Sequence, residues 1–140
     1  MRTRAIALRD LEKVAKMKNW FVEENALHAA EGGLELEVRL PWYRSLPLSV
    51  IDFGEVRING ATIDPGAITF RVNGKDRRPG ELRGLWQESW YVLDSAYIRF
   101  PFPAVKPGAQ YEVDITFILH PPYIPKVFFP FSHKKVMTAN

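Results

Sequence analysis

Three histidines are the first residues to test for acid–base chemistry in this chain. A nucleophile–base arrangement needs a Ser, Thr or Lys near a histidine that an acid orients. His28, His120 and His133 stand in no recognisable elbow or triad motif. His120 is the one to test first, because it lies beside two prolines at the end of the most regular predicted strand. The sequence therefore predicts no catalytic residue in this chain.

The residue spacing also indicates neither a metal site nor a catalytic pair of carboxylates. No two histidines share a metal-ligand spacing such as HxH or HxxxH, and the chain has no cysteine. We therefore expect no metal ion and no other cofactor bound by this chain alone. Asp52 and Glu55, or Asp94 with a distant acid, could pair for glycoside hydrolysis. Their sequence setting favours solvated turn and edge residues instead.

Residues 40–49 contain three side chains suited to binding another molecule, Trp42, Tyr43 and Arg44, in succession. Two prolines in this stretch remove backbone donors, so it cannot continue as a central strand and predicts an ordered corner. One interpretation is ordinary packing, with Arg44 in a surface salt bridge. The others are a protein interface, where Trp, Tyr and Arg are enriched, or a platform for a sugar or polyphenol. The sequence leaves these alternatives open.

A second candidate surface lies near the C-terminus. Residues 120–125 are held extended by three prolines, and a cluster of phenylalanines follows them. These phenylalanines either wrap the domain's own core or meet another protein, since such a cluster in water would favour aggregation. The residues predicted to contact a substrate or partner are Trp42, Tyr43, Arg44, His120, Tyr123, Phe128 and Phe129.

The elements that must position these residues are short strands. Eleven prolines and nine glycines punctuate the chain, and turn signals recur every eight to twelve residues or so. The pattern predicts an all-β fold: a single-domain antiparallel β-sandwich, or a flattened barrel, with about seven or eight strands. We place the sandwich at residues 19–125, after a leader at 1–18 and before an aromatic and basic tail at 126–140. The leader has leucines at helical spacing, so it is either a short amphipathic helix or a mobile segment.

Alternating apolar residues predict strands at residues 34–40 and 111–119, and a strand-like run begins at Trp20. Asn59-Gly60 predicts a hairpin, because a type I′ turn needs positive φ at both central positions. A second Asn-Gly pair leads into a polar loop at 75–84. Trp86 and Trp90 are four residues apart, and we expect both to belong to the core rather than to a ligand site.

Chain length, apolar runs and net charge argue against several classes of protein. A chain of 140 residues fits one domain with a real core. No apolar run approaches the roughly eighteen residues that a membrane span needs, and a bacterial cytosolic protein is the simplest interpretation. The net charge of +3 is modest, and acids dilute the basic residues, which argues against nucleic-acid binding.

The corner at 40–49, the two Asn-Gly turns, Trp90 and the stretch 122–125 resemble, in order and spacing, the beta subunit family of bacterial C-glycoside deglycosidases. The resemblance implies a larger alpha subunit similar to sugar-phosphate isomerase or epimerase barrels, which holds a divalent metal, taken as manganese. It implies cleavage of the carbon–carbon bond between sugar and aromatic ring in 3-oxo-C-glycosides. This chain would then stabilise the alpha subunit and help to wall the substrate cleft. It would be inactive alone.

A competing hypothesis needs no partner. The same aromatic and polar residues fit a stand-alone β-sandwich module that binds carbohydrate or phenolic ligands. Tryptophan fluorescence would separate the two hypotheses, because such a module responds to its ligand with no second protein present.

Overall fold

The structure is a computed structural model of the chain, and it describes residues 21–124 and 126–140. These residues form eleven strands and three short 3-10 helices. The strands are β1 Leu27–Ala30, β2 Gly33–Arg39, β3 Leu46–Pro47, β4 Ile51–Ile58, β5 Ala61–Thr62, β6 Thr69–Val72, β7 Lys75–Arg77, β8 Ser89–Trp90, β9 Ser95–Pro101, β10 Gln110–Leu119 and β11 Phe129–Thr138. The 3-10 helices are η1 Leu48–Val50, η2 Pro65–Ala67 and η3 Pro79–Gly84.

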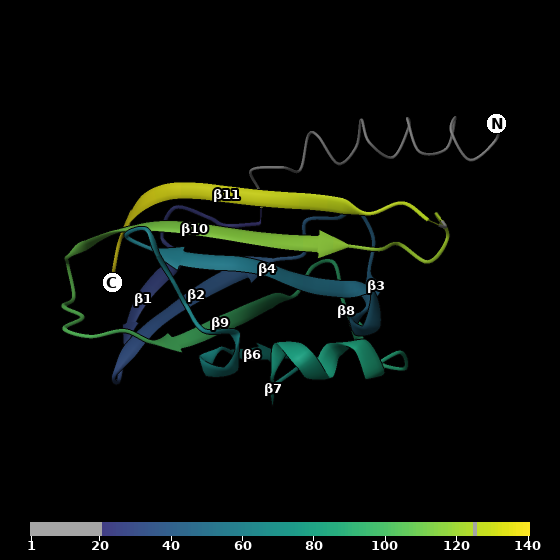
Figure 1. The fold of residues 1–140 in the computed structure, drawn as a ribbon, viewed down its shortest axis with the longest axis horizontal. Helices are drawn as coiled ribbons and strands as arrows, with labels where there is room; N and C mark the ends of the chain where they lie inside the picture. Colours follow the sequence, from purple (N-terminus) through teal and green to yellow (C-terminus); the bar gives the residue numbers. More distant parts are fainter. Residues whose placement is uncertain (1–20, 125) are drawn as a thin grey trace.

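Two open antiparallel sheets lie in two layers, with a small third pairing at one end (Figure 1). The larger sheet has the order β1-β2-β9-β6-β7, the second has the order β11-β10-β4-β5, and β3 pairs with β8. The predicted all-β antiparallel sandwich is confirmed, and in the described part of the chain none of these sheets closes into a barrel. Strands β3 and β8 and the β10–β11 connection lie toward the same end of the molecule, at the right in Figure 1.

An aromatic cluster joins the three sheets. The ring of Phe70 on β6 lies 5.4 Å from that of Trp90 on β8, and Trp90 lies 5.8 Å from Phe117 on β10. Phe53 on β4 makes edge contacts with both Phe70 and Phe117, at 5.1 and 5.0 Å. Edge-to-face aromatic pairs of this kind add to the stabilisation that burial already provides. Trp90 is therefore a core residue, as the sequence predicted.

The segments with alternating apolar residues form strands, as predicted. Leu34, Leu36 and Val38 point into the core from β2, because successive side chains of a strand alternate between its faces. Gly33 begins this strand where β9 passes closely: a Cβ there would lie 2.1 Å from the carbonyl oxygen of Phe100. Strand β10 buries every second residue in the same way and is one of the two longest described strands.

Both Asn-Gly pairs make tight hairpins. Asn59 and Gly60 have φ of 54° and 81° and join β4 to β5, as predicted. Asn73 and Gly74 have φ of 54° and 74° and join β6 to β7, with Val72 opposite Lys75. The region expected to be a polar loop at 75–84 therefore contains β7 and η3.

The C-terminal segment differs from the expected tail. Strand β11 pairs along its whole length with β10, and Phe129 and Phe131 are buried in the core. The alternation of Phe129, Phe131 and Met137 is masked in the sequence by the basic residues between them. Beyond β11, the main chain of Asn140 bonds to Ala29 and to Leu27, so the chain end reaches the other sheet.

Three further expectations need correction or fall outside the description. Trp86 is not a core residue: its side chain is 68% exposed, because residues 85–88 form a loop and only Trp90 reaches the core. The strand-like run expected from Trp20 is not a strand in its described part. Phe21 and Val22 are buried in a bend. The leader at 1–18 lies outside the described residues.

Candidate functional site

The corner at residues 40–45 places its first aromatic ring in the core. Trp42 follows β2 and is completely buried, with its ring 5.2 Å from Phe129 and 6.3 Å from Phe131. These rings belong to β11, so the corner and the C-terminal strand pack together. Of the alternatives left open by the sequence, Trp42 therefore fits ordinary packing in the core.

Tyr123 links the corner to the β10–β11 connection. The indole N–H of Trp42 donates a hydrogen bond to the Tyr123 hydroxyl, which in turn donates to the Tyr43 hydroxyl at 3.4 Å. This contact satisfies the polar atom of a buried tryptophan, as such atoms generally require. The Arg44 guanidinium lies 4.8 Å from the centre of the Tyr123 ring, which is a cation–π contact.

The second predicted group centres on His120. Its Nε2 lies 2.9 Å from Oδ2 of Asp52, and its backbone N–H donates to the Val50 carbonyl at 2.8 Å. The register of β4 with β10 sets this contact, since Asp52 lies opposite Ile118. Arg83 approaches the other Asp52 oxygen at 3.9 Å. Glu55, the other acid considered with Asp52, binds Arg57 at 2.5 Å, as the sequence setting of a solvated edge residue predicts.

A shallow hollow of about 390 Å³ lies beside this pair. His120, Pro121, Pro122, Lys126 and Phe128 are among the residues that line it. The Phe128 ring is 60% exposed, and its centre lies 6.1 Å from that of His120. An accessible imidazole held by a carboxylate can give or take a proton, and the adjacent ring can stack on a planar group.

The structure brings the seven predicted site residues into two neighbouring groups. Trp42, Tyr43, Arg44, Tyr123 and Phe129 form one connected cluster. His120 and Phe128 form the other, and the β10–β11 connection, at residues 120–124 and 126–128, carries the exposed side chains of both groups apart from Arg44. We call this connection, together with Arg44, the loop surface.

The other sequence candidates lie elsewhere. His28 is on β1, and His133 is on β11 with its ring 5.8 Å from Phe21. Burial, with a smaller contribution from Lys135, lowers the pKa of His133 below its ordinary value of 6.5. Across residues 21–124 and 126–140, no group of three or more His, Asp or Glu side chains is arranged to hold a metal ion. Nor does any helix in that part of the chain have the length and apolarity to cross a bilayer.

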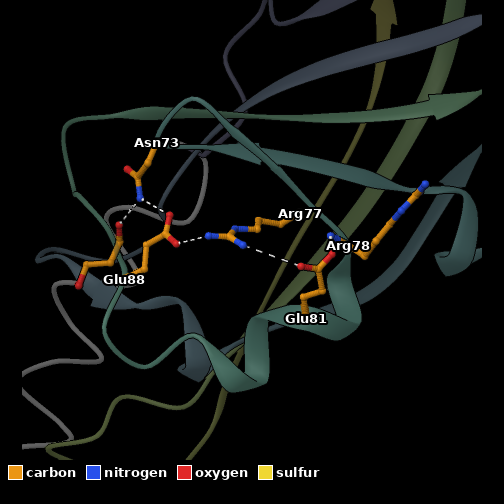
Figure 2. Close-up of polar contacts among 6 residues, drawn as sticks. Asn73, Arg77, Arg78, Glu81 and Glu88 are labelled. Atoms are coloured by element: carbon orange, nitrogen blue, oxygen red, sulfur yellow. Dashed lines mark hydrogen bonds and ion pairs between the residues drawn. The ribbon is translucent and has the colours of Figure 1, made fainter.

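Sequence reasoning missed a second hollow of about 580 Å³ on another face. It lies between the Asn73-Gly74 turn and the loop before and after β8, and Trp86 and Glu88 are among its lining residues. Figure 2 shows Glu88 between Asn73 and Arg77, with Arg77 also directed toward Glu81. The spacing of the two tryptophans was the available signal, but it does not tell which of them faces water.

Comparison with known proteins decides the family. A family model described as C-glycoside deglycosidase beta subunit matches residues 13–123. The 3'-dehydrocarminate deglycosidase beta subunit of a Microbacterium species is 35% identical over 111 residues, which is 79% of this chain and 83% of that protein. The C-glycoside deglycosidase beta subunit of Microbacterium trichothecenolyticum is 34% identical over 103 residues, which is 74% of this chain and 78% of that protein. The chain belongs to the C-glycoside deglycosidase beta subunit family.

The family match confirms the resemblance seen in the sequence, and it covers most of the predicted site. Trp42, Tyr43, Arg44, His120 and Tyr123 lie inside the matched range, whereas Phe128 and Phe129 lie beyond it. As a C-glycoside deglycosidase beta subunit, the chain is one component of an enzyme complex and has an alpha subunit as its partner.

Proposed function

We propose that this beta subunit supports an alpha subunit that cleaves the carbon–carbon bond between sugar and aromatic ring in 3-oxo-C-glycosides. The observation that carries the proposal is the family match over residues 13–123, together with relatives that are named as beta subunits of deglycosidases. One of them is named for 3'-dehydrocarminate, which agrees with a substrate already oxidised on its sugar.

The chemistry in this proposal follows from the ketone at C3 of the sugar. The ketone acidifies the proton on C2, and a base of the alpha subunit removes it. The electrons then form the C1–C2 double bond as the bond from C1 to the aryl group breaks, and the released ring carbon takes up a proton. A divalent metal ion, expected to be manganese in the alpha subunit, would stabilise the developing enolate oxygen. The beta subunit supplies neither the base nor the metal ligands.

The loop surface is the part of this chain that we assign to the alpha subunit and the substrate cleft. It presents an exposed phenylalanine, a tyrosine under an arginine, and a histidine held by a carboxylate. Tyr and Arg are among the residues that dominate binding energy at protein interfaces. The aromatic core below the surface fixes its geometry, so the beta subunit offers a preorganised wall rather than a flexible one.

Coexpression with candidate alpha subunits tests this assignment. Barrel proteins similar to sugar-phosphate isomerases are coexpressed with the tagged beta subunit, and the mass of the purified species is measured by light scattering. We expect a complex of defined stoichiometry, and we expect Phe128→Ala to weaken it. A beta subunit that remains a stable monomer beside every such barrel would contradict the proposal. Leu93→Ala, another exposed apolar residue but outside the loop surface, serves as the matched control.

A further inference from the structure

The hollow between the Asn73-Gly74 turn and residues 84–94 has the size of a small-molecule site. Its volume of about 580 Å³ falls within the range of roughly 300–1,000 Å³ that ligand pockets occupy. Asn73, Lys75, Trp86, Glu88, Tyr91 and Asp94 line it. It lies apart from the loop surface, with no lining residue in common.

The aromatic side of this hollow is exposed although its loop is well anchored. Trp90 fills the core, and its indole N–H donates to the Asp94 carbonyl at 2.9 Å. The backbone N–H of Val92 donates to Ser45 Oγ at 2.9 Å. Trp86 and Tyr91, which is 56% exposed, therefore face water on a fixed loop. Exposed aromatic rings on a rigid support are a feature of recognition surfaces.

The polar side of the hollow holds a fixed carboxylate. Asn73 Nδ2 donates to Glu88 Oε2 at 3.0 Å, and Arg77 donates to Oε1 at 2.6 Å (Figure 2). The hydrogen bond from Asn73, and after it the interactions with Arg77, lower the pKa of Glu88, while burial opposes them. Its backbone is held as well, because the Glu88 carbonyl accepts from the Leu48 N–H at 2.8 Å. A carboxylate has about four lone-pair sites, so acceptors remain for a ligand.

We propose that this hollow binds the glycosyl part of a ligand. The C–H face of a pyranose ring is apolar and stacks on an indole, while its hydroxyl groups need hydrogen-bond partners. Trp86 supplies the stacking face, Glu88 and Asp94 supply acceptors, and Lys75 supplies a donor. The inference goes beyond the subunit role, because the site lies on this chain and binds without the alpha subunit.

The test is a titration of the full chain with methyl β-glucopyranoside and, separately, with a phenyl C-glucoside. Binding is followed by the NMR signals of the indole N–H groups, of which the chain has four. We expect the Trp86 signal to shift with both sugars, and Trp86→Ala to weaken binding about tenfold through loss of stacking. Glu88→Gln should also weaken it. Leu93→Ala, an 81% exposed residue of the same loop that does not line the hollow, should leave binding unchanged.

Several outcomes would overturn the inference. One is no shift of the Trp86 signal at high sugar concentration, and another is equal weakening by Trp86→Ala and Leu93→Ala. A third is loss of alpha-subunit binding in Trp86→Ala with no response to sugar, which would make this face a docking surface instead. The coexpression experiment with alpha subunits is independent of this titration. If a complex forms but no sugar binds at Trp86, only this inference is wrong. Sugar binding without a complex defeats only the proposed function.

Discussion

The Nε2 atom of His120 lies 2.9 Å from the Asp52 carboxylate, and both side chains reach solvent at the rim of the loop surface. The contact joins the end of β10 to the start of β4 across 68 positions of sequence. An imidazole in this setting can bind a substrate hydroxyl or transfer a proton. Since we place the base on the alpha subunit, we assign His120 to binding.

His120→Ala in the reconstituted complex should therefore raise KM and leave kcat nearly unchanged. The loss of one hydrogen bond, about 0.5–1.5 kcal/mol, corresponds to a KM increase of about tenfold or less. Initial rates over a range of 3-oxo-C-glycoside concentrations measure both constants. His28→Ala, on β1, is the control. A large fall in kcat at constant KM would show that His120 takes part in proton transfer.

Tyr123→Phe should destabilise the beta subunit, although Tyr123 is partly exposed. The substitution removes the acceptor for the buried Trp42 indole N–H, and an unsatisfied buried donor costs about 1–3 kcal/mol. Urea unfolding of the isolated chain measures the free energy of unfolding. Tyr91→Phe should change it by no more than about 0.5 kcal/mol, because that side chain is largely exposed. Equal stability of the two variants would mean that the Trp42–Tyr123 contact contributes nothing.

Glu88 should make the stability of the chain depend on acid pH. Its pKa is below the ordinary value of 4.5 in the folded chain, so on acidification the unfolded chain takes up the proton first. The stabilisation is therefore complete above pH 4.5 and is lost as pH falls through the folded pKa. The urea midpoints of the wild type and Glu88→Gln should differ at neutral pH and converge in acid. A difference that stays constant with pH would refute this role of Glu88.

His133 should affect the stability of the chain in a separate pH range, closer to neutral. Its pKa is lowered below 6.5 by burial, so the unfolded chain again binds the proton first as pH falls. Stability should decline from pH 6.5 downward until the folded pKa is passed. His133→Phe keeps a ring against Phe21 and removes the titrating group, so the urea midpoint should no longer decline in this range. An unchanged decline would assign it to other groups.

What the sequence could predict depended on how local the signal was. The hairpin at Asn59-Gly60 needs only two residues with positive φ, and it formed as expected. The alternation in β2 and β10 was equally local. Strand β11 was missed because His133 and Lys135 share the face of its buried residues and the apolar Val136 lies on the other face, so pairing with β10 decides its structure. Such pairing is a property of the whole sheet.

The site was harder to predict than the fold, because its contacts join distant segments. Trp42 and Tyr123 are 81 positions apart, and nothing in either segment specifies the other. The residues selected by their chemical type do cluster in the structure. Their types alone did not indicate that Trp42 is buried while Trp86 is exposed. Two tryptophans four residues apart share a face only in a regular element. Here Trp86 lies in a loop before the two-residue strand β8.

The most direct test of the subunit account is the initial rate of aglycone release from a 3-oxo-C-glycoside by metal-supplied proteins. The rate is measured for the beta subunit alone, for the alpha subunit alone and for the two together. We expect turnover by the combined proteins and none by the beta subunit alone. Release of the aglycone by this chain without a partner would contradict the account.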